Sequence, residues 1–262
     1  MDKLSAKLIR DYLKHDSIGV NVAESVPSTN AELKILAETG APEGTLLAAD
    51  SQTAGRGRVG KSFYSPNGGL YMSIILRPEL DFEKSLLITT CAAVSTAEAI
   101  KDVIGVDVGI KWVNDLFYNG KKVCGILTEA PFDAERGKIK YAVLGIGINV
   151  FEAVDGYGEL SDIAGALIKG ETDGEIKSRL ASAVVDRFFD RYENLTSESH
   201  YEEYKRRLFL LGRDVYVLKG NNREKMRVLD ITRDFNLVLQ KEDGEKITMS
   251  SGEISIIPQV NS

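Results

Sequence analysis

The chain has 262 residues, of which 43% are hydrophobic and 27% charged, a composition that is ordinary for a soluble globular protein. This length is enough for one large domain, or for one domain with a small appendage. No apolar run reaches the roughly 18 residues that a membrane span needs, and the start of the chain lacks the apolar stretch of a signal peptide. The net charge of −6 argues against nucleic acid as the main partner, because nucleic-acid-binding domains carry a basic excess.

The few cysteines and histidines narrow the chemistry. Cys91 and Cys124 have neither metal-ligand spacing nor a disulfide framework, and we interpret both as reduced core residues of a cytoplasmic protein. The two histidines, His15 and His200, lie in polar stretches with helical periodicity. This pattern disfavours a histidine-based triad or a zinc centre, and we expect no metal site built from side chains.

Hydrophobic periodicity predicts a mixture of helices and strands in the first half of the chain. A capping box with Thr29 at the N-cap and Glu32 three residues later starts one helix, which Gly40 ends. A second helix, rich in Ala and Leu, spans 85–104 and is closed by Gly105. The other predicted elements are a short amphipathic helix at 3–14 and strands at 18–25, 45–51 and 69–76.

The second half begins with the clearest hairpin of the chain. Predicted strands at 108–118 and 121–129 flank Asn119-Gly120, a preferred two-residue turn. The elements that follow are a nearly all-apolar strand at 141–150 and helices at 175–195 and 201–211.

After Gly212 the sequence changes character. Short β-type runs alternate with Gly, Asn and Asp turns, at 215–218, 225–231, 237–240 and 246–249. This pattern predicts a small β-barrel of about 50 residues and divides the chain into domains at 1–211 and 212–262. We interpret the basic cluster in this part as a solvated face of the barrel; it comprises Lys219, Arg223, Lys225 and Arg227.

The run GRGRVGKS at residues 55–62 satisfies both the P-loop pattern and the G-x-G-x-x-G dinucleotide pattern. Both sites need a helix directly after the glycines, because the helix N-terminus holds the phosphate. Residues 63–69 (FYSPNGG) are turn-forming and cannot propagate a helix. We therefore predict a flexible cationic flap that presents Arg56, Arg58 and Lys61 to a polyanionic ligand.

Some residues have two interpretations. Lys111 lies among apolar residues of a predicted strand, and it either projects to solvent at a sheet edge or faces a carboxylate or phosphate. Gly145 and Gly147 indicate either a bulge or tight sheet packing, or else a close approach of a ligand to the backbone. Asn149 either caps the end of a strand or binds a metal–nucleotide.

Local structure is a sufficient explanation for several other polar residues. Helix capping alone is enough to explain Ser28 and Thr29. The end of a strand is by itself enough to explain Asn114 and Asp115. Trp112, the single tryptophan, is more typical of a core residue than of a stacking platform.

Together, an ordered set of motifs resembles the biotin protein ligases. The segments are STN at 28–30, QTAGRGR at 52–58, SP at 65–66, GLYMS at 69–73, KWVND at 111–115, KVCGILTE at 122–129, GIGINV at 145–150 and SGEIS at 251–255. They extend over nearly the whole chain, and the ordered set is far more specific than any single motif.

The resemblance implies an α/β (α+β) fold in which helices flank a mixed central β-sheet, followed by a small C-terminal β-barrel domain. It also implies a two-step reaction. The carboxylate of biotin attacks the α-phosphate of MgATP to give biotinyl-5′-adenylate and pyrophosphate, and a lysine of a biotin carboxyl carrier domain then takes the biotin as an amide. Biotin and MgATP are the expected substrates, without a tightly bound prosthetic group. A two-fold homodimer through sheet edges is expected on the resemblance alone.

The resemblance also implies site residues. Contacts to biotin are expected from Ser28, Thr29, Asn30, Gln52, Gly55, Arg56, Gly57, Arg58, Lys111, Gly125, Gly145 and Gly147. Contacts to ATP are expected from Arg56, Arg58, Phe63, Lys111, Asn114 and Asn149. Catalytic roles fall to Lys111 and Arg58. The sequence assigns no base to the second step, for which Asp115 is only a candidate.

The chain departs from the family pattern at identifiable positions. Val113 replaces the usual proline, Lys61 stands where arginine is common, and Phe63 stands where tryptophan is common. We expect Phe63 still to cover the adenine, with less stacking area. The helix-turn-helix domain of the bifunctional ligase–repressors is missing, so we expect no operator binding.

Two other functions fit parts of the sequence. A lipoate or octanoate ligase would share the architecture and the central lysine, but that family tends to carry an arginine pair followed by three glycines, which this chain lacks. A non-enzymatic biotin-sensing module, or a weak nucleic-acid element built on the Arg-Gly loop, is disfavoured by the net acidity.

Overall fold

The computed structural model describes residues 2–133, 135, 137–154, 156–170, 174–195, 199–219, 222–250 and 255–258. The helices are α1 (Ala6–Tyr12), α2 (Thr29–Glu38), α3 (Leu86–Ile104), α4 (Ile176–Tyr192) and α5 (Tyr201–Arg207). None of the helices in the described part is long and apolar enough to cross a membrane.

A seven-stranded sheet forms the centre of the molecule, with strand order β1-β2-β3-β9-β6-β5-β4. Its strands are β1 (Gly19–Val26), β2 (Thr45–Gln52), β3 (Leu70–Leu76), β4 (Gly109–Lys111), β5 (Asp115–Tyr118), β6 (Lys121–Glu129) and β9 (Ala142–Ile148). A small hairpin of β7 (Phe132–Asp133) and β8 (Lys138–Ile139) lies between β6 and β9 in the chain. The β1–β2 pair is parallel and the other neighbours are antiparallel, so the predicted mixed sheet is confirmed.

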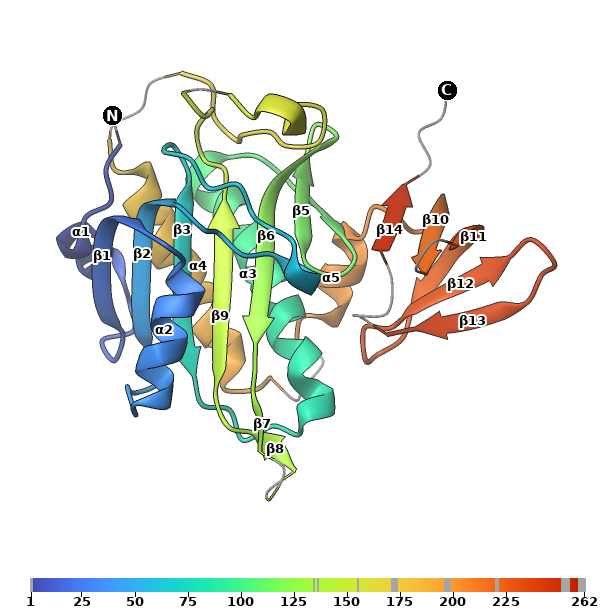
Figure 1. Ribbon diagram of the computed structural model, residues 1–262, viewed down its shortest axis with the longest axis horizontal. Coiled ribbons are helices and arrows are strands. Elements are labelled where there is room, and N and C mark those ends of the chain that lie inside the picture. Colours follow the sequence, from blue (N-terminus) through green and yellow to red (C-terminus); the bar gives the residue numbers. More distant parts are fainter. Residues whose placement is uncertain are drawn as a thin grey trace.

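Helices cover both faces of this sheet (Figure 1). The helix α2 packs on one face, against β3 and β9, while α3 and α4 pack against each other and against the other face. As predicted, α3 is a buried helix, and Gly105 ends it in the left-handed conformation with φ +84°.

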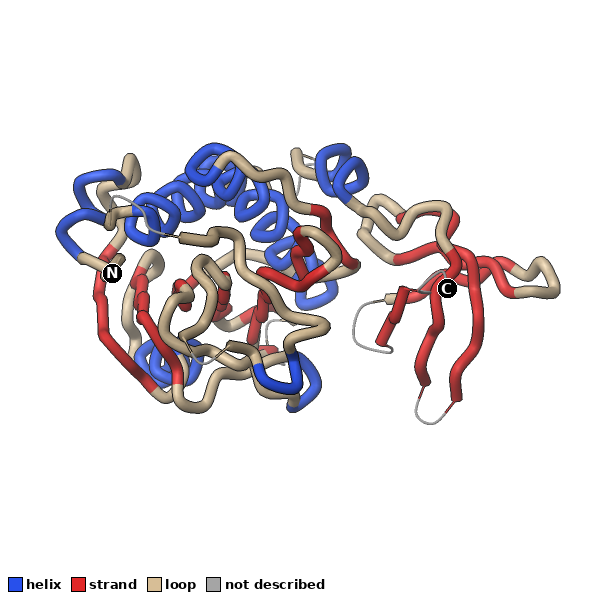
Figure 2. Tube along the Cα trace, turned by 90° about the horizontal axis from the view of Figure 1, so that it is seen from above, coloured by secondary structure: helices blue, strands red, loops and turns tan. Residues whose placement is uncertain are grey.

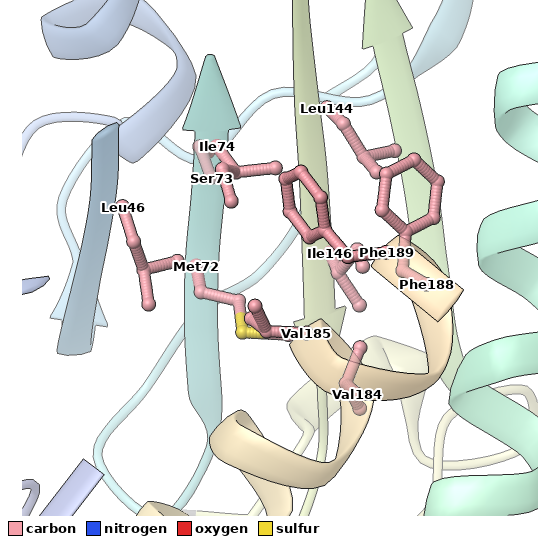
Figure 3. A pocket seen from close by; sticks show the side chains of 10 residues that line it. All are labelled: Leu46, Met72, Ser73, Ile74, Leu144, Ile146, Val184, Val185, Phe188 and Phe189. Carbon is pink, nitrogen blue, oxygen red and sulfur yellow. The ribbon is translucent and has the colours of Figure 1, made fainter. Parts of the chain in front are cut away.

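Part of the main core lies between α4 and the sheet. Apolar side chains from β2, β3, β9 and α4 meet there around a cavity of only about 10 Å³ (Figure 3). Such close packing fixes the strands that carry the candidate site. Both cysteines are buried, unpaired thiols, and burial raises the pKa of Cys91 to about 12.

The predicted hairpin is only partly right. The Asn119-Gly120 turn joins β5 to β6 as expected, with φ values of 48° and 76° that suit this residue pair. The first predicted strand, 108–118, is wrong as a single strand because the chain reverses between β4 and β5. Gly109 pairs with Phe117 and Lys111 with Asp115, so Lys111 lies on the outermost strand of the sheet, next to a tight turn.

The C-terminal strands form a separate antiparallel sheet (Figure 2). Its order is β13-β12-β11-β10-β14, from β10 (Asp214–Lys219), β11 (Asn222–Ile231), β12 (Leu237–Lys241), β13 (Lys246–Met249) and β14 (Ser255–Pro258). The predicted barrel is wrong for the described residues, because closure would need β13 to pair with β14 and these strands lie at opposite ends of the order. The boundary at 211/212 remains a prediction. Residues 251–254 of the last motif lie outside the described residues, as do the side chains of Ser255 and Lys219.

His200 is buried between α3 and the turn that joins β11 to β12, not in the polar surroundings that its sequence neighbours suggested. Its ring stacks on Phe235 at 4.9 Å between centroids, and Nε2 lies 2.9 Å from Thr90 Oγ1. Its Nδ1 atom is buried without a hydrogen-bond partner among the described residues. Burial lowers the pKa of His200 from 6.5 to about 4, and Arg191 acts in the same direction.

This burial predicts acid-sensitive stability. The unfolded chain binds a proton at His200 near pH 6.5, whereas the folded chain binds it only near pH 4, so the contribution of a neutral His200 is complete above pH 6.5 and is lost as the pH falls toward 4. The loss is about 3 kcal/mol at most. Urea unfolding of wild type and His200→Gln at pH 7 and pH 4.5 measures it. The difference in unfolding free energy between the two proteins should shrink at the lower pH. His15→Gln is the control, and an equal difference at both pH values for His200→Gln would contradict the prediction.

Candidate functional site

The helix α2 begins one residue earlier than the sequence predicted. Ser28 is its N-cap, and Ser28 Oγ accepts a hydrogen bond from the Ala31 N–H at 3.4 Å. The capping box built on Thr29 is therefore wrong. Because Ser28 satisfies the helix end, the buried hydroxyl of Thr29 is left to bond to other elements.

Thr29 belongs to a chain of buried polar contacts beside α2. Gln52 Oε1 accepts hydrogen bonds from the Thr29 N–H at 2.9 Å and from the Thr29 hydroxyl at 3.2 Å. Gln52 Nε2 donates to Ser65 Oγ at 2.9 Å. On the other side, Ser73 Oγ lies 2.7 Å from Thr29 Oγ1 and 2.6 Å from Asn30 Oδ1. These contacts join α2, β2 and β3.

Glu129 connects this chain to the flap. Asn30 Nδ2 donates to Glu129 Oε2 at 2.9 Å, and Glu129 Oε1 lies 3.6 Å from Arg56 Nη1. Arg56 is about half exposed, so this ion pair alone is a weak tether. It nevertheless aims the Arg56 guanidinium at the polar chain.

A cavity of about 30 Å³ lies against these groups. It is lined by Ser28, Thr29, Asn30, Gln52, Arg56, Phe63, Tyr71, Met72, Gly125, Leu127, Gly145, Ile146 and Gly147. The structure thus brings together most of the residues predicted to contact biotin. Gly55, Gly57, Arg58 and Lys111 from that prediction do not line it.

Glycines form the floor of the cavity because side chains occupy the space above them. A Cβ on Gly145 would lie 2.0 Å from Asn30 Oδ1, and a Cβ on Gly147 or Gly125 would lie 2.6 or 2.7 Å from the Phe63 ring. The pairing of β9 with both neighbours is regular through this region, so the bulge interpretation does not hold. Phe63 lies inside the cavity here, and its contact with an adenine remains a prediction.

The flap at residues 55–62 is a loop closed by main-chain hydrogen bonds. The Gly57 N–H donates to the Lys61 carbonyl at 2.7 Å, and the Phe63 N–H donates to the Gly55 carbonyl at 2.9 Å. The segment contains one short 3-10 turn, Arg58–Gly60, and then continues extended. As the sequence predicted, no α-helix follows the glycines, which excludes both the P-loop and the dinucleotide fingerprint.

The Arg58 side chain does not line the cavity; it binds the turn before β5 instead. Its Nη1 donates to Asn114 Oδ1 at 3.0 Å, while Asn114 Nδ2 donates to the Ile126 carbonyl at 2.8 Å. Burial lowers the pKa of Arg58, an effect that Asp115 and Tyr204 partly oppose. The guanidinium stays charged, because arginine does not lose its proton in proteins. Arg58 also borders a second cavity, of about 180 Å³.

Lys111 is paired with Asp115 across the β4–β5 turn, and its Nζ lies 5.8 Å from the centre of the Phe117 ring. Burial lowers the pKa of Lys111; Asp115 raises it again, and the nearby cations Lys122 and Lys61 lower it further. Asp115 Oδ1 lies 2.7 Å from Lys122 Nζ, and Lys122 Nζ lies 5.5 Å from the centre of the Phe63 ring. The half-buried ammonium of Lys111 therefore belongs to a cationic group beside the cavity, which favours the anion-binding interpretation over free projection to solvent.

Asn149 has one satisfied and one unsatisfied side-chain atom. Its Nδ2 donates to the Gly165 carbonyl at 3.0 Å, while its buried Oδ1 has no hydrogen-bond partner in the part of the chain that the structure describes. A buried carbonyl oxygen without a partner is costly. This oxygen could be satisfied by a nucleotide or its magnesium ion.

Three residues of the site received no role from the sequence, although they lie in the quoted motifs. Ser73 is the single polar residue of β3, and its neighbours are all apolar. Glu129 shares the strand parity of Gly125 on β6, so alternation could have placed it on the cavity face. No comparable sequence pattern marked Lys122 as a residue of the site.

The two ends of the site differ in chemistry. Around Thr29 and Gln52 the groups are neutral hydrogen-bond donors and acceptors, which suit an uncharged polar ring. Around Lys111 and Arg58 the groups are cations, which suit carboxylate or phosphate. The arrangement can therefore hold a ligand that is polar but uncharged at one end and anionic at the other.

The contact between Gly145 and Asn30 makes a testable prediction about stability. Gly145→Ala should lower the free energy of unfolding by about 1–3 kcal/mol, because the added methyl group displaces an amide held by Ser73 and Glu129. Urea unfolding measures this. The matched control is Gly19→Ala, whose Cβ meets nothing within 4 Å; it should change stability by about 0.5 kcal/mol or less. Equal effects of the two substitutions would contradict the prediction.

Comparison with known proteins adds independent observations. The Biotin/lipoate A/B protein ligase family model matches residues 22–149. The bifunctional ligase/repressor BirA of Bacillus spizizenii is 38% identical over 196 residues, which cover 73% of this chain and 60% of that protein. The chain thus spans 60% of the length of this relative and of its Bacillus subtilis counterpart.

Other relatives match the chain over nearly its whole length. The biotin–[acetyl-CoA-carboxylase] ligase of Mycobacterium tuberculosis is 25% identical, with 96% of this chain and 95% of that protein covered. The structure of the biotin protein ligase from Aquifex aeolicus in complex with biotin and ATP superposes with a TM-score of 0.73 and 26% identity, covering 92% of this chain and 99% of that one. The chain therefore belongs to the biotin/lipoate A/B protein ligase family and, within it, to the biotin protein ligases.

Proposed function

We propose that the protein is an ATP-dependent biotin protein ligase, which forms biotinyl-5′-adenylate and transfers the biotin to a lysine of a biotin carboxyl carrier domain. The observation that carries this proposal is the polarity of the site. A neutral hydrogen-bonding chain through Thr29 and Gln52 adjoins a cationic group that contains Arg56, Arg58 and Lys111. Biotin has the matching shape, with an uncharged ureido ring at one end and a carboxylate at the other.

The ureido ring would bind among Ser28, Thr29 and Gln52, whose hydroxyl and amide groups can satisfy one carbonyl and two N–H groups. Small-ligand pockets usually measure about 300 Å³ or more, whereas the cavity measures about 30 Å³. Phe63 therefore has to leave the floor formed by Gly125 and Gly147 before biotin can enter. Since Phe63 directly follows the flap, this movement would couple binding to flap rearrangement.

In the first step a carboxylate oxygen of biotin forms a bond to the α-phosphorus of ATP, and the bond to the pyrophosphate oxygen breaks. The carboxylate is already ionised at neutral pH, so no base is needed. The main obstacle is repulsion between two anions, which Arg56, Arg58 and Lys111 would offset by preorganised positive charge. Magnesium would enter as part of the MgATP substrate, beside the unsatisfied Asn149 Oδ1.

In the second step the lysine nitrogen of the carrier forms a bond to the acyl carbon of the adenylate, and AMP leaves with the electrons of the broken C–O bond. The attacking amine must first lose a proton, because free lysine titrates near pH 10.4. We propose Asp115 as the candidate base, near Lys111 and Lys122. A closed flap would keep water away from the adenylate.

The remaining expectations stay predictions. They are the carrier domain as protein partner, the absence of nucleic-acid binding, a homodimer, a cytoplasmic location and the domain boundary at 211/212.

The proposed function is tested by biotin-dependent exchange of labelled pyrophosphate into ATP, followed by labelling of a purified carrier domain. Exchange with biotin, and not with lipoate or octanoate, is the expected result. Exchange that depends on lipoate or octanoate instead would assign the chain to the other branch of its family. Chelation of magnesium should abolish the exchange.

Lys111→Ala should lower the exchange rate by about 10²–10³-fold, because it removes one preorganised cation from the reacting anions. Lys101→Ala, at the exposed end of α3, is the control and should exchange at the wild-type rate. A Lys111→Ala rate within a few-fold of wild type would remove Lys111 from the mechanism.

Arg58→Ala should release the adenylate. Its hydrogen bond to Asn114 ties the flap to the β4–β5 turn, and without that bond the intermediate is less well enclosed. Free biotinyl-5′-adenylate in solution should rise while labelling of the carrier falls, as measured by chromatography and by carrier mass. Arg223→Ala, which changes an arginine stacked on Tyr216 in the C-terminal sheet, is the control. Full retention of the adenylate by Arg58→Ala would show that Arg58 does not close the flap.

A further inference from the structure

The three-residue turn from Trp112 to Asn114 sets the geometry of the cationic end of the site. Lys111 ends β4 directly before the turn, and Asp115 begins β5 directly after it. Asn114, inside the turn, holds Arg58. Any movement of this turn would displace an ammonium and a guanidinium at the same time.

Two hydrogen bonds connect the turn to residues that are distant in the sequence, 91 and 123 positions away. The Tyr204 hydroxyl, on α5, donates to the Val113 carbonyl at 3.0 Å. The Trp112 Nε1–H donates to the Phe235 carbonyl at 2.8 Å, in the C-terminal sheet. Both bonds are buried, where the loss of either would leave a polar group without water.

Phe235 is held in an unusual conformation at the centre of this contact. It lies in the turn between β11 and β12, has φ +59° and is almost fully buried. Its ring packs against Tyr204 at 5.1 Å, Tyr201 at 5.7 Å and His200 at 4.9 Å between centroids. A bulky residue with positive φ persists only where the surrounding packing compensates for the strain.

The segment around α5 also holds β4 itself. Arg207 Nη1 donates to the Val108 carbonyl at 3.0 Å, and the Phe209 N–H donates to the Ile110 carbonyl at 3.3 Å. The chain after α5 therefore lies along the edge strand that leads to Lys111. Since β4 is only three residues long, these external contacts supply much of its support.

We propose that Tyr204 and Phe235 are positioning residues for adenylation: they hold the Trp112–Asn114 turn so that Lys111 and Arg58 face the reacting anions. The inference rests on the proposed function and adds to it that the C-terminal sheet acts on catalysis without touching the substrate. The turn between β11 and β12 acts through the main-chain carbonyl of Phe235, and α5 acts alongside it through the Tyr204 hydroxyl.

Burial raises the pKa of Tyr204 well above its ordinary value, and Arg58 opposes this shift. The hydroxyl therefore keeps its proton at neutral pH, where it donates its hydrogen bond to the Val113 carbonyl. Both groups bind the same turn, Arg58 at the Asn114 side chain and Tyr204 at the Val113 carbonyl.

Two tyrosines on α5 provide a matched experiment. Tyr204→Phe removes the bond to the catalytic turn, while Tyr201→Phe removes an equally buried bond, to the Ile231 carbonyl at 2.8 Å, that does not reach the turn. Tyr204→Phe should lower kcat for pyrophosphate exchange by about 10-fold with little change in the KM for biotin, because misplacement affects the transition state most. Tyr201→Phe should keep the wild-type kcat even where its melting temperature falls as much. A wild-type kcat for Tyr204→Phe, or equal losses in both variants, would overturn the proposal.

The single tryptophan gives a readout that needs no activity. Trp112 emission and acrylamide quenching report the state of the turn, so Tyr204→Phe and Phe235→Leu should shift the emission to longer wavelength and increase quenching, while Tyr201→Phe should not. Phe235→Leu keeps the main-chain carbonyl that accepts from Trp112, and it replaces Tyr204→Phe in this test if that variant does not fold. Unchanged Trp112 signals in both variants would overturn the inference. If wild type gives no biotin-dependent exchange, the proposed function fails, and these signals alone decide whether the turn is held as described.

Discussion

Positive charge is concentrated at one end of the site, and the surrounding structure has to compensate for the cost of keeping it there. Two arginines and two lysines meet two carboxylates: Arg56, Arg58, Lys111, Lys122, Glu129 and Asp115. Burial lowers the pKa of Lys111 and of Arg58, so their charged forms are less well stabilised here than in water. A ligand that brings a carboxylate and phosphates would relieve this imbalance.

Neutral hydrogen bonds organise the other end of the site. The chain from Gln52 through Thr29 and Ser73 to Asn30 fixes side chains from α2, β2 and β3 against one another. A buried hydrogen-bond network costs free energy when some of its groups lack partners, so these side chains have few alternative arrangements. Gly145 is part of the same constraint, because the Asn30 amide occupies the place where its side chain would be.

Much of the fold was predictable because it depends on local pattern. The buried helix α3 follows from its Ala- and Leu-rich sequence and ends at Gly105, where positive φ suits glycine. The Asn119-Gly120 turn is a local signal of the same kind. Turn-forming residues after Gly60 were sufficient to exclude a phosphate-binding helix. The candidate cavity residues were found through the family resemblance, since no local rule assigns a ligand to Thr29 or Gln52.

By itself the sequence determined most of the helices and strands, their order and the cationic glycine-rich loop, because backbone propensity and hydrophobic period act over a few residues. Only the tertiary structure decided that the chain reverses after Lys111, that Phe63 lies over the cavity floor, and that the C-terminal strands form an open sheet. It also decided that Tyr204 and Phe235 reach the turn beside Lys111. These features depend on contacts between residues far apart in the chain, and such contacts leave no periodic signal in a single sequence.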